Sequence, residues 1–126
     1  MIQRGSFLNV IDNSGARKVQ CIGLYNGFKK KFANLGDIIL ITVKRLRSKR
    51  REFVKAKKGQ IYKALIVRVK SNTKFKENCF FFKENAVVIL NPKNKLLGAR
   101  IFGGVPQQLR YSKFLKLISL AFGLIR

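Results

Sequence analysis

Gly36-Asp37-Ile38-Ile39-Leu40-Ile41-Thr42-Val43 decides the fold, because a turn pair leads into six residues that are apolar or β-branched. This length and composition favour a buried β-strand over a helix. Short runs of similar character lie at residues 7–11, 17–25, 61–69, 80–82, 86–90 and 100–102. Turn-forming residues separate most of these runs. Several short strands joined by turns predict a mainly β protein built on a small closed barrel.

Alternation and turn residues predict the local detail of this barrel. Val19 and Cys21 should face one side of their strand, and Lys18 and Gln20 the other. Asn26-Gly27 is the strongest hairpin pair in the chain, so residues 28–32 are expected to form the return arm. Residues 71–78 are expected to form a polar, basic loop.

The pattern changes near the C-terminus. Gly103-Gly104 is expected to be a plain bend, and Phe114, Leu117, Ile118 and Ala121 then recur at helical spacing. The chain has 126 residues, which suits one domain. We expect a barrel over about residues 1–103, with hairpin extensions, and a short helical tail over about residues 104–126.

The charge balance identifies the class of partner. The chain has 28 Lys and Arg residues against 5 Asp and Glu residues, a formal net charge of +23. Such a domain repels itself, and a dense polyanion would neutralise it while releasing counterions. Nucleic acid is therefore the expected partner, and an anionic membrane surface is the alternative. No apolar run is long enough to span a membrane, so no membrane anchor is expected.

The sequence offers little for catalysis. It has no His, and its five acidic residues are spread along the chain, so general acid–base chemistry lacks its usual groups. Cys21 and Cys79 cannot form an ordinary zinc site alone, and we interpret them as small apolar residues, a disulfide being the alternative. No enzymatic activity, metal or cofactor is expected, although distant acids could in principle assemble a magnesium site.

Six motifs resemble, in order, the universal large-subunit ribosomal protein fourteen family. The opening segment is Leu8-Asn9-Val10-Ile11-Asp12-Asn13-Ser14-Gly15-Ala16-Arg17-Lys18-Val19-Gln20-Cys21-Ile22. The other five are Gly36-Asp37-Ile38-Ile39-Leu40-Ile41-Thr42-Val43-Lys44, Lys57-Lys58-Gly59-Gln60-Ile61-Tyr62-Lys63-Ala64-Leu65-Ile66-Val67-Arg68, Asn85-Ala86-Val87-Val88-Ile89-Leu90-Asn91, Gly98-Ala99-Arg100-Ile101-Phe102-Gly103 and Lys113-Phe114-Leu115-Lys116-Leu117-Ile118-Ser119-Leu120-Ala121.

The resemblance implies a five-stranded β-barrel with a small C-terminal helical region. It also implies a structural constituent of the large ribosomal subunit that binds large-subunit ribosomal RNA. By resemblance, the protein would pack against large-subunit proteins three and nineteen and face small-subunit ribosomal RNA at an intersubunit bridge. It would also form the docking surface of the ribosome-silencing factor.

The charge pattern and the resemblance together select the candidate site residues. Those expected to bind ribosomal RNA are Asn13, Ser14, Arg17, Lys18, Lys29, Lys30, Lys31, Lys44, Arg45, Arg47, Lys49, Arg50, Arg51, Lys55, Lys57 and Lys58. By resemblance, Ala99, Arg100 and Lys116 belong to the surface for the bridge and the silencing factor.

Residue usage and competing functions complete the sequence-based predictions. Heavy use of Phe, Ile, Lys and Asn, without a transit-peptide pattern, indicates a protein made inside an organelle. A mitochondrial ribosome is favoured, with a plastid or bacterial ribosome as the alternatives. Two other functions stay open: a free barrel that binds single-stranded nucleic acid on exposed aromatic residues, and a cationic protein held on a membrane surface by residues 114–125.

Overall fold

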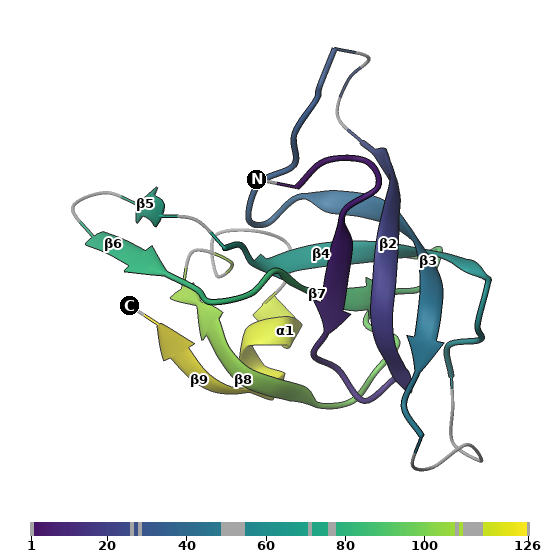
Figure 1. Cartoon of the computed structure of the whole chain (residues 1–126). Coiled ribbons are helices and arrows are strands. Elements are labelled where there is room, and N and C mark those ends of the chain that lie inside the picture. Colours follow the sequence, from purple (N-terminus) through teal and green to yellow (C-terminus); the bar gives the residue numbers. More distant parts are fainter. Residues whose placement is uncertain are drawn as a thin grey trace.

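The computed structural model describes residues 2–25, 27, 29–48, 55–70, 72–75, 78–107, 109 and 115–125. Its elements in chain order are β1 (Phe7–Val10), β2 (Ala16–Leu24), β3 (Ile38–Leu46), β4 (Ile61–Arg68), β5 (Asn72–Phe75), β6 (Asn78–Phe81), β7 (Ala86–Leu90), β8 (Ile101–Pro106), α1 (Leu115–Leu120) and β9 (Ala121–Ile125). Five strands close into a barrel in the order β1-β2-β3-β4-β7 (Figure 1). The mainly β fold, the five-stranded barrel and the short C-terminal helix are thus confirmed.

Closure of the barrel depends on one parallel pair. β1 pairs in parallel with β7, whereas the other four neighbouring pairs are antiparallel. Closing the sheet leaves no barrel strand with a free edge. Val19 and Cys21 on β2 are fully buried and Lys18 is exposed, which confirms the predicted alternation.

Two hydrophobic clusters hold the molecule together. One fills the barrel and includes Val19, Ile41 and Ile66. The second joins the outer faces of β4 and β7, through residues such as Leu65 and Val88, to β8 and α1. β7 and residues 64–67 of β4 are therefore covered on both faces, which explains why these stretches are continuously apolar rather than alternating.

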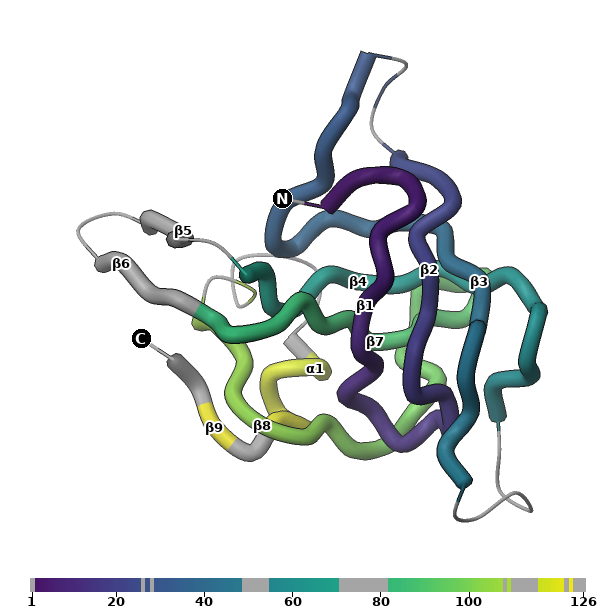
Figure 2. The backbone as a smooth tube through the Cα atoms, viewed as in Figure 1, coloured from purple at the N-terminus to yellow at the C-terminus, as the bar shows by residue number. Residues whose placement is uncertain are grey.

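The predicted return arm over residues 28–32 is wrong in the part that the structure describes. Residues 29–32 form no strand, and the partner of β2 is β3. Because β1 and β3 already occupy the two edges of β2, no edge remains for this segment. Residues 29–32 project from one end of the barrel instead (Figure 2). Ala33, the next residue in the sequence, pairs with Ile2.

The predicted loop over residues 71–78 contains a strand. β5 pairs antiparallel with β6, with Thr73 opposite Phe80 and Phe75 opposite Asn78. Lysines among these residues masked the pattern in the sequence, while Thr and Phe have good strand propensity. The hairpin forms a small sheet separate from the barrel.

The predicted C-terminal helix is confirmed by α1, whereas the expectations for Gly103-Gly104 and for the residues after α1 are wrong. β8 continues through Gly103 and Gly104, where a bend was expected, and the chain after α1 becomes β9. β8 and β9 pair in parallel, with Gly104 opposite Gly123. This long-range pairing overrides the local helical spacing, which the sequence alone cannot weigh.

Candidate nucleic-acid interface

A β-bulge exposes consecutive cations on the barrel wall. In the pairing of β2 with β3, Lys18 lies opposite Arg45 and Val19 lies opposite Val43, so Lys44 is one residue in excess. A bulge of this kind sets two residues against one and bends the strand. Lys18, Lys44 and Arg45 are all exposed as a result.

Two loops meet the end of the barrel beside this bulge. The N–H groups of Lys55 and Ala56 donate to the Ser14 carbonyl oxygen at 3.0 and 3.1 Å, and the N–H of Arg47 donates to the Gly15 carbonyl oxygen at 2.8 Å. These bonds bring together eight predicted cations, which we call the basic end: Arg17, Lys18, Lys44, Arg45, Arg47, Lys55, Lys57 and Lys58.

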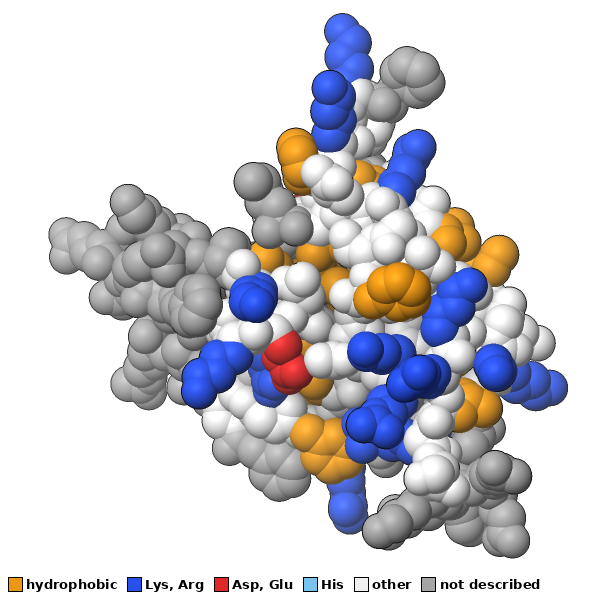
Figure 3. Space-filling view, in the orientation of Figure 1, with side chains coloured by type: hydrophobic (Ala, Val, Ile, Leu, Met, Phe, Trp, Pro, Cys, Tyr) orange, Lys and Arg blue, Asp and Glu red, His pale blue; other side chains and the backbone are white. Residues whose placement is uncertain are grey.

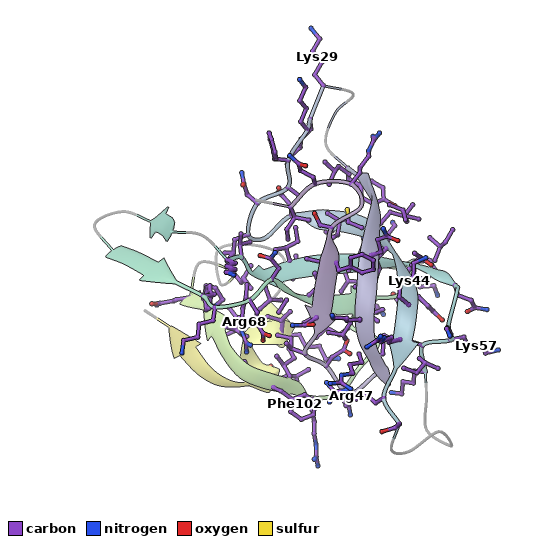
Figure 4. All side chains as sticks on the ribbon, in the orientation of Figure 1. Lys29, Lys44, Arg47, Lys57, Arg68 and Phe102 are labelled. Atoms are coloured by element: carbon purple, nitrogen blue, oxygen red, sulfur yellow. The ribbon has the colours of Figure 1, made fainter. Side chains whose placement is uncertain are left out.

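The space-filling view agrees with this grouping. Figure 3 shows Lys and Arg side chains gathered over the lower parts of β1, β2 and β3. Figure 4 places Lys44, Arg47 and Lys57 in the same half of the molecule. Fixed spacing of cations on a rigid wall suits contacts to phosphates.

The other predicted lysines lie elsewhere. Lys29 lies at the tip of the projecting segment, at the opposite end of the molecule from Arg47 (Figure 4). Lys29 and Lys31 are exposed, whereas the ammonium of Lys30 is 2.7 Å from a carboxylate oxygen of Asp37. The structure therefore divides the predicted cations into two groups, and Lys30 is partly neutralised.

The loop after β1 is organised by a buried carboxylate. Asp12 is fully buried, and its two oxygens accept hydrogen bonds from the N–H and hydroxyl of Ser14 and from the N–H of Ile89. Burial raises the pKa of Asp12 above its ordinary value, although these hydrogen bonds and the charge of Arg47 act in the opposite direction. Asp12 therefore links the loop after β1 to β7 through buried hydrogen bonds to Ser14 and Ile89.

Asn13 and Ser14 have structural contacts within the same loop. The Asn13 side-chain oxygen accepts hydrogen bonds from the N–H groups of Ala99 and Arg100, at 2.7 and 3.2 Å. Ser14 is fully buried, so it shapes the loop rather than presenting its hydroxyl to a ligand. Asn13 thereby links the basic end to the segment that carries Ala99 and Arg100.

A hollow beside the basic end contains residues that the sequence did not indicate. It has a volume of about 470 Å³ and is lined by Asn9, Val10, Ile11, Arg17, Arg47, Arg68, Glu84, Phe102 and Gly103. Arg68 and Phe102 were missed because each lies in a run predicted as an ordinary strand. The signal in the sequence was an arginine directly after the apolar run Ala64-Leu65-Ile66-Val67, since a charge beside a buried strand needs partners.

The residues expected at a protein or bridge surface are accessible. Ala99 and Arg100 are exposed just before β8, and Lys116 is exposed on α1, which packs against β8. Lys49, Arg50 and Arg51 lie outside the described residues.

Other candidate chemistry is limited in the described part of the chain. No group of three or more Cys, Asp or Glu residues gathers there as a metal site would require. Cys21 is buried and its thiol is free, and burial raises the pKa of that thiol. Among the described helices, none has the length and apolarity needed to cross a membrane.

The fold and the basic end together define a small, strongly basic β-barrel protein. The family model described as Ribosomal protein L14p/L23e matches residues 1–125. The chain belongs to this family of structural, non-enzymatic ribosomal proteins and is a structural constituent of the large ribosomal subunit. The resemblance noted in the sequence is confirmed, and the protein is localised to the ribosome.

Proposed function

We propose that this protein binds large-subunit ribosomal RNA through its basic end and helps to hold that RNA in place during translation. The observation that carries the proposal is the meeting of the β3 bulge with residues 13–17 and 55–58, which fixes eight cations at one end of a closed barrel. Cations at fixed spacing can follow a folded phosphate backbone by its shape. Lys29, Lys31 and the predicted cations outside the described residues would extend the contact.

Co-sedimentation tests this function directly. The protein should sediment with large ribosomal subunits and stay with them through a moderate salt wash, because many simultaneous phosphate contacts release many counterions. Release at low salt, or sedimentation with the small subunit, would count against the proposal.

Replacing Arg17 with Glu should reduce incorporation into large subunits by about ten-fold or more. The change removes one phosphate contact and sets a negative charge at the edge of the basic end, a loss on the order of 1–3 kcal/mol. Incorporation can be measured by competition with tagged wild-type protein. Lys93→Glu is the matched control, since Lys93 is an exposed lysine in the turn after β7. Equal losses in both variants would show that Arg17 makes no special contact.

We also propose a second surface, formed by Ala99, Arg100 and Lys116. It would face the small-subunit ribosomal RNA of the bridge and the ribosome-silencing factor, while large-subunit proteins three and nineteen would pack nearby. The support is the exposure of Ala99 and Arg100 just before β8 and of Lys116 on α1, outside the barrel, together with family membership. Exposed cations beside apolar packing suit an acidic partner.

The variant Arg100→Glu/Lys116→Glu should leave large-subunit assembly intact and reduce subunit joining or silencing-factor binding by about ten-fold or more, because each reversal opposes an acidic partner. Sucrose-gradient profiles measure both outcomes together. If assembly of the large subunit itself collapses, these cations are ordinary ribosomal RNA contacts and the second surface is wrong.

The ribosome concerned is, in our proposal, mitochondrial, with the plastid and the bacterial cytoplasm as alternatives. The support is the amino-acid bias of the chain rather than any contact in the structure. We further propose that the chain acts as a single ribosomal-protein domain, because the second cluster fastens β8 and α1 to the barrel wall.

A further inference from the structure

The hollow between β1, β4 and β8 combines an accessible aromatic ring with guanidinium groups. Phe102 is 41% exposed, although its neighbour Ile101 is fully buried. The guanidinium carbon of Arg47 lies 5.3 Å from the centre of the Phe102 ring, over its face. Figure 4 shows these two residues beside each other at one end of the barrel, with Arg68 nearby. Arg17 completes the lining.

The backbone under Phe102 is held from both sides. Its N–H donates to the Ile11 carbonyl oxygen at 2.7 Å, and its carbonyl oxygen accepts from Arg68 at 2.6 Å. Arg68 also donates to the Gly104 carbonyl oxygen at 2.9 Å and pairs with Glu84 at 3.3 Å. The backbone that carries the Phe102 ring is therefore already ordered, so binding a ligand on this ring would cost little additional conformational entropy.

The side chains that line the hollow keep an excess of positive charge, which can bind an anion. Glu84 is occupied by Arg68 and by the side-chain amide of Asn9, whose N–H donates to it at 2.8 Å. Arg47 donates to the Val10 carbonyl oxygen at 3.1 Å, which positions its guanidinium without neutralising it. Arg17 has no acidic partner among the described residues. The hollow thus keeps positive charge from Arg17 and Arg47 next to an aromatic face.

Other exposed aromatic side chains do not share this setting. Among the residues whose side-chain burial the structure describes, they are Phe7, Tyr25 and Phe32, and Phe7 alone lies on a barrel strand. They form no single stacking platform of the kind that single-stranded nucleic-acid binders display. Phe102 differs because a guanidinium covers one face and further arginines flank it. Planar guanidinium groups, unlike ammonium groups, offer both charge and a stacking surface.

We propose that this hollow binds one unpaired nucleotide of RNA, with its base stacked on Phe102 and Arg47 and its phosphate held by Arg17. The inference rests on the proposed function, since it assigns a specific element of RNA to one edge of the basic end. A base flipped out of a loop or bulge presents a free π-face, whereas paired bases are already stacked. The hollow would therefore recognise a local irregularity of the RNA, which the surrounding lysines alone cannot do.

Anisotropy of fluorescently labelled RNA tests the proposal with the full chain. The probes are a short single-stranded oligouridylate and a perfectly paired RNA duplex. Phe102→Ala should weaken oligouridylate binding by about ten-fold, because one stacked base is lost, and leave duplex binding unchanged. Phe7→Ala is the matched control and should change neither, since Phe7 is even more exposed but lies outside the hollow. Arg17→Gln should weaken oligouridylate binding and lower its salt slope by about one, because it removes the phosphate contact.

If the Phe102→Ala variant does not fold, the Phe102→Leu variant provides the same test. Leucine retains apolar volume without a π-face, so it should show most of the same loss, with thermal unfolding unchanged. A loss no greater than that of Phe7→Ala, or an equal loss on duplex, overturns the nucleotide site. Unchanged RNA binding with poorer retention on salt-washed large subunits overturns it too and indicates a protein contact. If the wild-type chain binds neither RNA probe and does not sediment with large subunits, both the nucleotide site and the proposed function are wrong.

Discussion

Replacing Asp12 with Ala should lower the free energy of unfolding by about 3 kcal/mol or more. Two backbone N–H groups and one hydroxyl donate to the buried Asp12 carboxylate, from Ser14 and Ile89. Each donor left without an acceptor in the interior costs about 1–3 kcal/mol. A domain of this size has a total stability of about 5–15 kcal/mol, so one substitution removes a large share of it. Thermal unfolding followed by circular dichroism measures the effect.

Asp37→Asn is the control for charge removal. Asp37 is partly exposed and pairs with Lys30, and its amide replacement can still accept the N–H of Asn34. Exposed ion pairs contribute about 1 kcal/mol or less, so the loss should be several times smaller than for Asp12→Ala. If both variants unfold at the same temperature, the hydrogen bonds of Asp12 do not organise the loop.

The same carboxylate predicts a pH dependence. Burial raises the pKa of Asp12, so between the ordinary value of 3.8 and the raised value the folded state holds a proton that the unfolded state releases. The contribution of Asp12 to the free energy of unfolding is therefore greatest below pH 3.8 and decreases as the pH rises through the raised pKa. Asp12→Asn cannot titrate, so its stability relative to the wild type should rise over this interval.

Gly103→Ala is expected to have the second large effect, on the order of 3 kcal/mol, by displacing Arg68. Gly103 has φ of +84°, where a side chain costs about 1–2 kcal/mol. A Cβ added there would also collide with Nη2 of Arg68. The guanidinium would then lose its hydrogen bonds to the carbonyl oxygens of Phe102 and Gly104, and these bonds connect β8 to β4 of the barrel. Chemical unfolding measures the loss.

Gly59→Ala separates the two causes. Gly59 has φ of +81°, yet an added Cβ there would meet nothing within 4 Å. It carries the backbone strain without the collision, so Gly103→Ala should be less stable than Gly59→Ala by about 1–2 kcal/mol.

A double-mutant cycle provides a second check. In an Arg68→Ala background the collision is gone, and Gly103→Ala should then cost no more than Gly59→Ala. Additive losses in that background would mean that Arg68 and Gly103 are not coupled through the guanidinium.

The barrel could be predicted because local pattern and tertiary environment agree there. Residues 38–43 and 86–90 are apolar runs with the length and composition of buried strands. The alternation of buried Val19 with exposed Lys18 matches a barrel strand with one face toward the core and one toward solvent. The hairpin of β5 with β6 and the strand β9 could not be predicted. The lysines of residues 71–78 hid β5, although its partner β6 follows it directly. β9 pairs with the distant β8, while the local helical spacing pointed the other way.

The candidate interface shows the same division. Charge counts alone predicted the polyanion partner, and the cations of residues 44–58 stay a predicted contact surface. The sequence could not show that Lys44 is exposed through a bulge, nor that Lys29 lies at the opposite end of the molecule. It also gave no sign that the Asn13 side-chain oxygen and the Ser14 hydroxyl make hydrogen bonds within the fold, and their contact with RNA stays a prediction.

The sequence by itself determined the class of fold and the sign of the partner, because hydrophobic periodicity and net charge are sums over many residues that no single contact can reverse. Tertiary structure decided the rest. Arg68 and Phe102 meet Arg47 only because β4, β8 and the end of β3 converge beside β1, from positions far apart in the chain. A hollow of this kind is a property of strand order and register, and those are fixed by long-range hydrogen bonds and packing that sequence spacing does not contain.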